Sequence, residues 1–135
     1  MTQEDKKTTG LEEQDELLLR QYIGAEWVHY VGGVVSGATL FKLFGDAATL
    51  IMVKHCGDES LLASYQDAQL MQPLQVGDFI EVWGRIDKVG KRSRQLVLKA
   101  YRVAGSLNDP ECPSRSVWLE EPVLVGTARL TCVVP

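Results

Sequence analysis

Apolar side chains are densest between Gly37 and His55, and the polar residues of this stretch recur every three or four positions. That spacing predicts a long helix buried over most of its circumference. Ser36, directly before it, is suited to cap the helix N-terminus. The stretch is nearly long enough to span a bilayer, but the charged residues inside it argue against a membrane span. Its polar stripe consists of Thr39, Lys42, Asp46 and Thr49.

The rest of the chain has the shorter, alternating period of β-strands. One apolar run precedes the helix, and a loop over residues 25–36 joins the two. After the helix, alternation and turn residues predict four more strands. The five expected strands are 17–23, 61–70, 79–89, 93–103 and 122–135.

Two details of the C-terminal third can be checked against a structure. Residues 104–121 contain Gly, Asn, Pro and Ser, and are expected to form a long surface excursion. In the last strand, alternate residues should share one face. These are Leu124, Gly126, Ala128, Leu130, Cys132 and Val134.

The order strand, helix, four strands predicts an α+β domain in which one buried helix packs on an antiparallel sheet of about five strands. A single helix covers only one face of such a sheet, so either the other face is solvated or a second subunit contributes. The apolar tail from Cys132 to Pro135 suggests a protected edge strand. We therefore expect an obligate oligomer.

Length and composition limit the class of protein to which the chain can belong. The 135 residues suit one domain, with a polar lead-in at 1–14 expected to be disordered and the domain at 15–135. A net charge of −4 argues against nucleic-acid binding. Three cysteines without CxxC spacing predict neither a zinc site nor a disulfide framework, which favours the cytoplasm. The first residues lack an apolar segment, so we expect no signal peptide.

Several motifs resemble one family. The turn and strand at 73–81 resemble a signature of the hotdog fold of acyl-CoA thioesterases and dehydratases. A longer set of motifs, spread over residues 16–135, resembles the 3-aminobutyryl-CoA ammonia-lyases, which are related to β-alanyl-CoA ammonia-lyase. These motifs are His29-Tyr30 with Gly32-Gly33, Gly37-Ala38, 43–49, 57–59, 76–81, 88–90, 119–122 and 131–135.

The resemblance implies a hotdog domain that reversibly eliminates ammonia from a short 3-aminoacyl-CoA to give a 2-enoyl-CoA. It implies no cofactor, because coenzyme A enters as part of the substrate. It also implies a homodimer with active sites at the subunit interface, able to assemble into a hexamer, and a place in amino acid fermentation. We expect no nucleic-acid or membrane partner.

Two residues are candidate catalytic groups. Asp46 resembles the helix Asp of hotdog thioesterases, and apolar neighbours would suit a base. Alternatively, Asp46 forms a solvated ion pair with Lys42, four residues away. His29 lies in a glycine-containing loop and can transfer protons near neutrality, or it only orders that loop. His55, at the helix end, suits the C-terminal dipole better.

Two further groups are candidate binding residues. Thioester oxygens could approach the free N–H groups of the helix N-terminus because of the glycines beside it. This substrate-binding set is Tyr30, Gly32, Gly33, Ser36 and Gly37. The basic turn could hold the phosphates of coenzyme A, or be only a solvated hairpin. It comprises Lys88, Gly90, Lys91, Arg92 and Arg94.

Two other functions stay open. Asp46 and the helix N-terminus would equally suit water attack on a thioester, as in a hotdog acyl-CoA thioesterase. Val34 and Ser36 stand where the ammonia-lyase pattern has Asn and Asp, which favours a third hypothesis, a non-catalytic acyl-CoA-binding subunit. Release of free thiol would indicate the thioesterase, elimination would indicate the lyase, and acyl-CoA binding without either would indicate the binding subunit.

Overall fold

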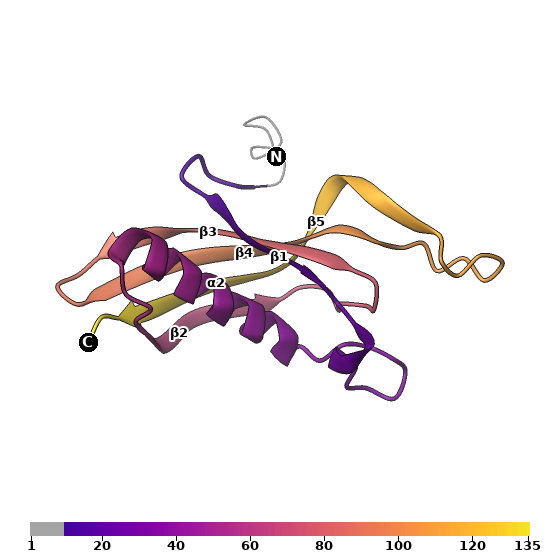
Figure 1. The fold of residues 1–135 in the computed structure, drawn as a ribbon, viewed down its shortest axis with the longest axis horizontal. Coiled ribbons are helices and arrows are strands. Elements are labelled where there is room, and N and C mark those ends of the chain that lie inside the picture. Colours follow the sequence, from indigo (N-terminus) through magenta and orange to yellow (C-terminus); the bar gives the residue numbers. More distant parts are fainter. Residues whose placement is uncertain (1–9) are drawn as a thin grey trace.

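One antiparallel sheet and one long helix are formed by residues 10–135, which the computed structural model describes. The strands lie in the order β1-β3-β4-β5-β2, and the sheet curls around α2 (Figure 1). This confirms the α+β hotdog architecture expected from the element order. The elements are β1 Glu16–Tyr22, the short 3-10 helix η1 Ala25–Trp27, α2 Ala38–Cys56, β2 Leu61–Leu70, β3 Phe79–Val89, β4 Ser93–Ser106 and β5 Ser116–Val133.

Helix α2 ends at Gly57, whose φ of 67° allows a left-handed cap with its N–H bonded to the Val53 carbonyl. One side of α2 packs on the sheet through Leu40, Leu43, Phe44, Ala47, Ala48, Ile51 and Met52. The other side is open, so the expected burial over most of the circumference is wrong for the single chain. Apolar Phe41, Leu50 and Val53 are 38–49% exposed there. No helix within residues 10–135 is long and apolar enough to cross a membrane.

The predicted excursion at 104–121 is mostly strand. Ala104 pairs with Trp118 and Ser106 with Ser116, which leaves 107–115 as the loop. Gly105 pairs with Val117 in the strand, and it is glycine because a Cβ there would lie within 3 Å of the Asp78 and Arg102 side chains. Sequence composition alone mistook this glycine for a loop signal.

The last strand differs from expectation in two ways. The alternation holds from Gly126 to Cys132, but a register irregularity turns Val125 into the core under α2 and Leu124 to the opposite face. In addition, β5 is not an edge, because it lies between β4 and β2. The edges are β1 and β2.

Strand β2 is an exposed edge. It pairs with β5 alone, and most of its residues are exposed, including Leu61 (66%) and Leu70 (49%). A ten-residue edge with apolar side chains offers unpaired backbone groups to another chain. This edge borders the open side of α2 (Figure 1), with the Phe41 and Tyr65 rings in contact at 5.1 Å.

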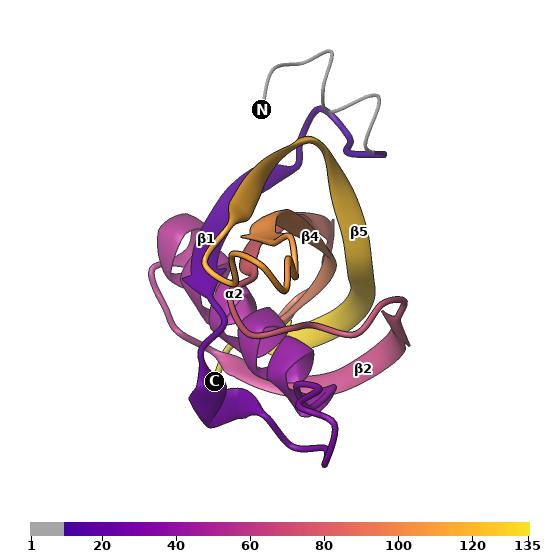
Figure 2. The ribbon, with the colours of Figure 1, turned by 90° about the vertical axis from the view of Figure 1, so that its right-hand side faces the viewer.

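A second, smaller core lies on the helix-free face of the sheet. Leu11 packs there with Trp83, Tyr101 and Val103. The predicted disorder of residues 1–14 is therefore wrong for 10–14, while residues 1–9 lie outside the described residues. Figure 2 shows β5 bending over this face, where Arg20 lies 5.6 Å above the ring of Trp118.

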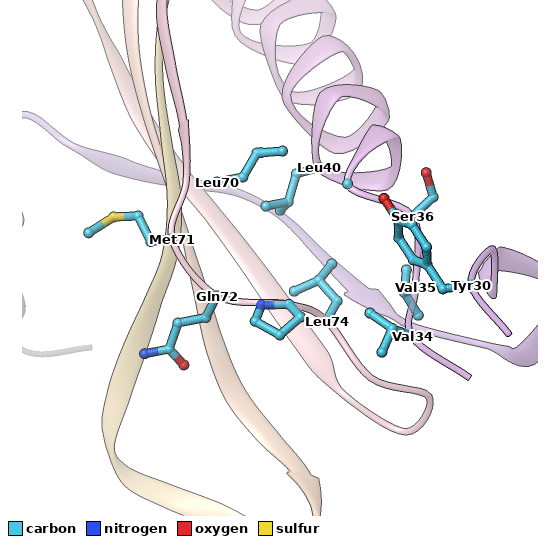
Figure 3. A pocket seen from close by; sticks show the side chains of 11 residues that line it. Tyr30, Val34, Val35, Ser36, Leu40, Leu70, Met71, Gln72 and Leu74 are labelled. Atoms are coloured by element: carbon cyan, nitrogen blue, oxygen red, sulfur yellow. The ribbon is translucent and has the colours of Figure 1, made fainter. Parts of the chain in front are cut away.

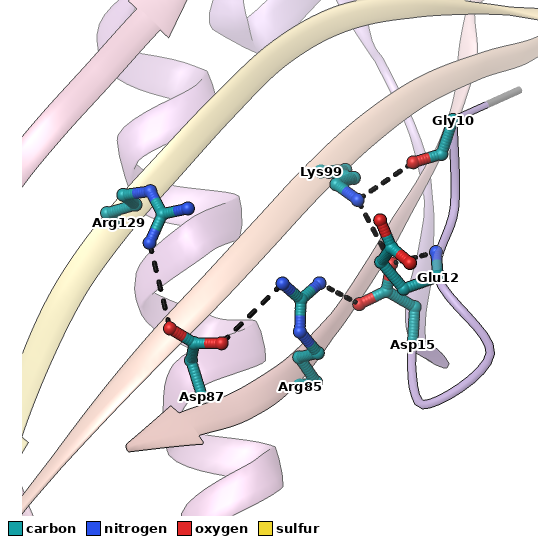
Figure 4. Close-up of polar contacts among 7 residues, drawn as sticks. All are labelled: Gly10, Glu12, Asp15, Arg85, Asp87, Lys99 and Arg129. Carbon is teal, nitrogen blue, oxygen red and sulfur yellow. Dashed lines mark hydrogen bonds and ion pairs between the residues drawn. The ribbon is translucent and has the colours of Figure 1, made fainter.

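A buried carboxylate fixes residues 10–15 to the sheet (Figure 4). The Asp15 side chain is fully buried and accepts hydrogen bonds from Arg85 at 3.0 Å and Lys99 at 3.1 Å. It also accepts from the Glu12 backbone N–H at 2.8 Å, and Lys99 donates to the Gly10 carbonyl as well. Two cations compensate the burial of one anion, as a buried charge requires.

Replacing Asp15 with Ala should lower the free energy of unfolding by about 3 kcal/mol, because Lys99 would remain mostly buried without its anion and Arg85 would keep only the longer contact with Asp87, at 3.6 Å. Urea denaturation at fixed protein concentration measures this. Asp109→Ala, which removes the more exposed pair with Arg115, is the control and should cost less than about 1 kcal/mol. If Asp15→Ala lowers the free energy of unfolding no more than the control does, Asp15 does not stabilise the fold.

Glu16 joins β1 to the end of α2 and predicts a pH dependence of stability. It accepts hydrogen bonds from Lys54 at 2.8 Å and contacts His55 at 2.9 Å. Burial raises the pKa of Glu16, but the hydrogen bonds from Lys54 and His55 and their charges outweigh it, so the pKa lies below its ordinary value of 4.5. Its stabilising effect is therefore complete above pH 4.5 and is lost as the pH falls through the lowered pKa.

Glu16→Gln should accordingly be less stable than wild type at neutral pH, and the difference should shrink between about pH 5 and pH 3. Unfolding free energies across that range measure it. Glu111→Gln, on the exposed loop, should show no pH-dependent difference. A difference that stays constant with pH would contradict the assigned role of the carboxylate charge.

Candidate active site

A pocket of about 210 Å³ opens at the N-terminus of α2 (Figure 3). It forms where the loop before α2 meets the segment that leaves the β2 edge. Three of the predicted substrate-binding residues, Tyr30, Ser36 and Gly37, line it. The remaining lining is mostly apolar: Val34, Val35, Leu40, Leu70, Met71, Gln72, Pro73 and Leu74.

The helix start provides a backbone donor in this pocket. The Ser36 hydroxyl accepts from the Ala38 N–H at 3.2 Å, and the Ser36 and Gly37 carbonyls accept from Thr39 and Leu40. Ser36 thus caps the helix from one residue before the cap position. Among the described residues, the Gly37 N–H has no hydrogen-bond acceptor. It lies at the positive end of the helix dipole, where an anionic oxygen is stabilised.

The glycine pair lies beside this pocket rather than in it. Gly32 and Gly33 line an adjoining hollow with Gln75, Val76 and Asn108, and only Val34 belongs to both. Gly33 has a φ of 84° and donates to the Tyr30 carbonyl, which closes a tight turn. Of the three glycines predicted to admit substrate to the helix N-terminus, Gly37 alone lines this pocket.

His29 is exposed and does not line the pocket. Its ring stands edge-on to Tyr30, with centroids 4.8 Å apart. Since Tyr30 does line the pocket, His29 lies one side chain away from it. The backbone N–H of His29 donates to the Val34 carbonyl, a bond that the loop would make with another residue at this position, so this bond assigns neither of the two roles to the imidazole.

Asp46 lies on the open side of α2, with about half of its side chain exposed. Both carboxylate oxygens accept from the Lys42 ammonium, at 3.0 and 2.8 Å, which is the ion pair foreseen as the alternative. The expected apolar burial of Asp46 is wrong for the single chain. Nine residues separate it from Gly37, or about 13 Å along the helix axis, so one chain does not bring Asp46 into the pocket.

The basic turn is at the far end of the molecule. It joins β3 to β4 beside the C-terminal end of α2, whereas the pocket lies at the N-terminal end (Figure 1). Lys88, Lys91 and Arg92 are exposed. Arg94 instead donates to the Gly90 and Ser93 carbonyls at 3.0 Å and so stabilises the turn itself.

Sequence reasoning missed the wall formed by residues 70–74, including Leu70 and Gln72. Their only signal was an irregular segment between a strand and a proline, which does not reveal which helix end it meets. The sequence reasoning also gave no role to Gly45. No three His, Cys, Asp or Glu side chains within residues 10–135 are grouped as a metal site requires.

Known proteins resemble the chain along most of its length. The family model of the thioesterase superfamily matches residues 32–106. A curated protein of Acetoanaerobium sticklandii, 3-aminobutyryl-CoA ammonia lyase, is 39% identical over 121 residues, which cover 87% of this chain and 93% of the relative.

Solved structures of the same family and superfamily also resemble the chain. β-Alanyl-CoA:ammonia lyase from Clostridium propionicum has a TM-score of 0.82 at 34% identity, covering 89% of this chain and 84% of that one. A hexameric thioesterase from Yersinia pestis has a TM-score of 0.73 at 15% identity, covering 93% and 90%, a likeness of fold alone. The chain therefore belongs to the hotdog-fold thioesterase superfamily and, within it, to the family of 3-aminobutyryl-CoA and β-alanyl-CoA ammonia lyases.

Proposed function

We propose that this protein catalyses the reversible elimination of ammonia from a short 3-aminoacyl-CoA, giving the 2-enoyl-CoA. The observation that carries the proposal is the 39% identity to an ammonia lyase over 87% of the chain. The apolar pocket at the start of α2 supports it, because an acyl chain needs an apolar site with a donor for its thioester oxygen.

The residues have separate roles in this reaction. The Asp46 carboxylate of the partner subunit takes the proton from C2 of the acyl chain, and the thioester oxygen gains negative charge, which the Gly37 N–H and the helix dipole stabilise. The C2 electron pair then forms the C2=C3 double bond, and the C3–N bond breaks to release ammonia. His29, beside the pocket, keeps the C3 amine protonated, so that it leaves as neutral ammonia. The residues and the thioester of coenzyme A suffice, without a cofactor.

A homodimer brings the separated groups together. The exposed β2 edge pairs with its counterpart in a second copy, and antiparallel pairing places the Leu61 end of one strand beside the Leu70 end of the other. Leu70 lines the pocket, whereas Leu61 pairs with Val133, which in turn pairs with Ser93 at the basic turn. The basic turn of one subunit therefore serves the pocket of its partner and holds the coenzyme A phosphates through Lys88, Lys91 and Arg92.

Further assembly of dimers into a hexamer, as in the Yersinia pestis thioesterase, is part of this proposal. So is a reducing cytoplasmic location and a role in amino acid fermentation. The cysteines Cys56, Cys112 and Cys132 are all unpaired, which suits a reducing compartment.

The superfamily relationship favours one rival, hydrolysis of the thioester by an Asp46-activated water. The altered loop at Val34 and Ser36 favours a subunit that binds acyl-CoA without turnover. Crotonyl-CoA with and without ammonium, at mildly alkaline pH, separates the three. Ammonium-dependent loss of the enoyl absorbance without free thiol supports the lyase, and thiol release without ammonium supports hydrolysis. Tight binding with neither supports the binding subunit.

Asp46→Asn should lower kcat by at least about a hundredfold, because an amide cannot accept the C2 proton. Its thermal unfolding midpoint should stay within a few degrees of wild type, since an exposed pair one helical turn apart contributes little stability. Steady-state kinetics with crotonyl-CoA and ammonium measure the effect, with Glu13→Gln as the exposed control. An unchanged rate in Asp46→Asn would remove Asp46 from the mechanism.

Mixed dimers test the shared site. We expect both Gly37→Val, which fills the pocket of its own chain, and the double variant Lys91→Glu, Arg92→Glu to be weakly active alone. When the two are co-expressed at equal levels, half of the dimers are mixed and each has one intact site of two, so activity should return to about a quarter of wild type. No recovery in purified mixed dimers would show that the basic turn serves its own subunit's pocket or none.

A further inference from the structure

Gly45 lies in the interior of α2, where glycine is the least favourable residue after proline. Close packing explains other glycines of this chain: a Cβ at Gly126 would lie 2.9 Å from the Gln69 carbonyl and 3.0 Å from Leu40. At Gly45 a Cβ would meet no atom within 4 Å. Packing within the chain therefore gives no reason for this glycine.

Because Gly45 has no side chain, the space above it on the open side of α2 is unfilled in the single chain. By helical spacing, the neighbours of position 45 on that surface are Phe41, Lys42 and Thr49, with Asp46 directly after it. Two of these neighbours are held in place. The Phe41 ring packs edge-on against Tyr65, and the Thr49 hydroxyl donates to the Gly45 carbonyl at 3.1 Å. We call this space the Gly45 notch.

A second observation sets this part of the surface apart. The ion pair of Lys42 and Asp46 stands among the exposed apolar side chains Phe41, Leu50 and Val53. When a partner or a ligand covers such a surface, an ion pair costs desolvation that apolar residues would avoid. The proposed role of Asp46 as the base gives a reason to retain these charges, and it would place the Gly45 notch beside the reacting atoms.

Resting on the proposed function, we propose that the Gly45 notch receives the substituent on C3 of the acyl chain bound in the partner subunit's pocket and makes Gly45 a specificity-determining residue. If Asp46 takes the proton from C2, then C3 is one bond away from the reacting carbon. The apolar wall at Phe41 suits a methyl group, which C3 of a 3-aminobutyryl chain carries and C3 of a β-alanyl chain lacks. Glycine and alanine differ by the same single methyl group, so Gly45→Ala would fill the room that the substrate methyl needs.

The test is Gly45→Ala with both thioesters. We expect kcat/KM for 3-aminobutyryl-CoA to fall by roughly tenfold or more, as for one misplaced methyl group in a fitted pocket, and kcat/KM for β-alanyl-CoA to stay within about twofold. The thermal unfolding midpoint should rise, because alanine is the better helix residue. A gain in stability with a loss confined to the methyl-bearing substrate is a pattern that a damaged fold does not produce.

Val53→Ala is the matched control, since it also improves helix propensity on the open side, two turns from the notch. It should leave the ratio of the two kcat/KM values unchanged. Equal losses on both thioesters in Gly45→Ala, or dissociation of its dimer in light scattering, would overturn the notch assignment and leave the lyase function intact. A wild-type protein inert towards both thioesters would overturn the proposed function and the notch with it.

Discussion

The packing of one side of α2 into the curled sheet is the constraint on which the rest of the structure depends. It fixes the start of the helix against the segment leaving β2, and that meeting creates the pocket at Gly37. It also turns the opposite side of the helix outward, with Lys42, Gly45 and Asp46 in view of solvent or of a second subunit. The packing of α2 on the sheet therefore forms the pocket at one end of the helix and leaves the candidate base Asp46 on its outer side, so the two are separated within one chain.

The helix-free face of the sheet is closed by charge as well as by apolar packing. Asp15 and Glu81 are buried carboxylates on this face, and each is paired with an Arg or a Lys from a neighbouring strand. Such pairs add little net stability over apolar residues, but they are costly to break. They fix residues 10–15 and the bend of β5 over the small second core, so the outer face needs no second helix. The side of α2 that faces away from the sheet and the adjoining edge β2 stay open.

The fold was largely predictable from periodicity, because a helix and alternating strands repeat at about 3.6 and 2 residues. The family motifs then identified the hotdog arrangement. The failures have physical causes. Strand pairing of Ala104 with Trp118 overrode a loop-like composition, and the apolar tail after Leu130 marks an interior strand, since edge position depends on order in the sheet. The burial of Asp46 was misjudged because an apolar neighbour in sequence can face a partner rather than the core.

Three features of the chain add little to the stability of a single subunit: a ten-residue open edge at β2, a glycine inside α2 and an exposed ion pair beside apolar side chains. They lie together, on the edge strand and the helix side that adjoins it. Natural proteins depart from local stability rules mainly at functional sites. The three features therefore support the proposed mechanism, which places Asp46 on this surface, by an argument that does not depend on any relative.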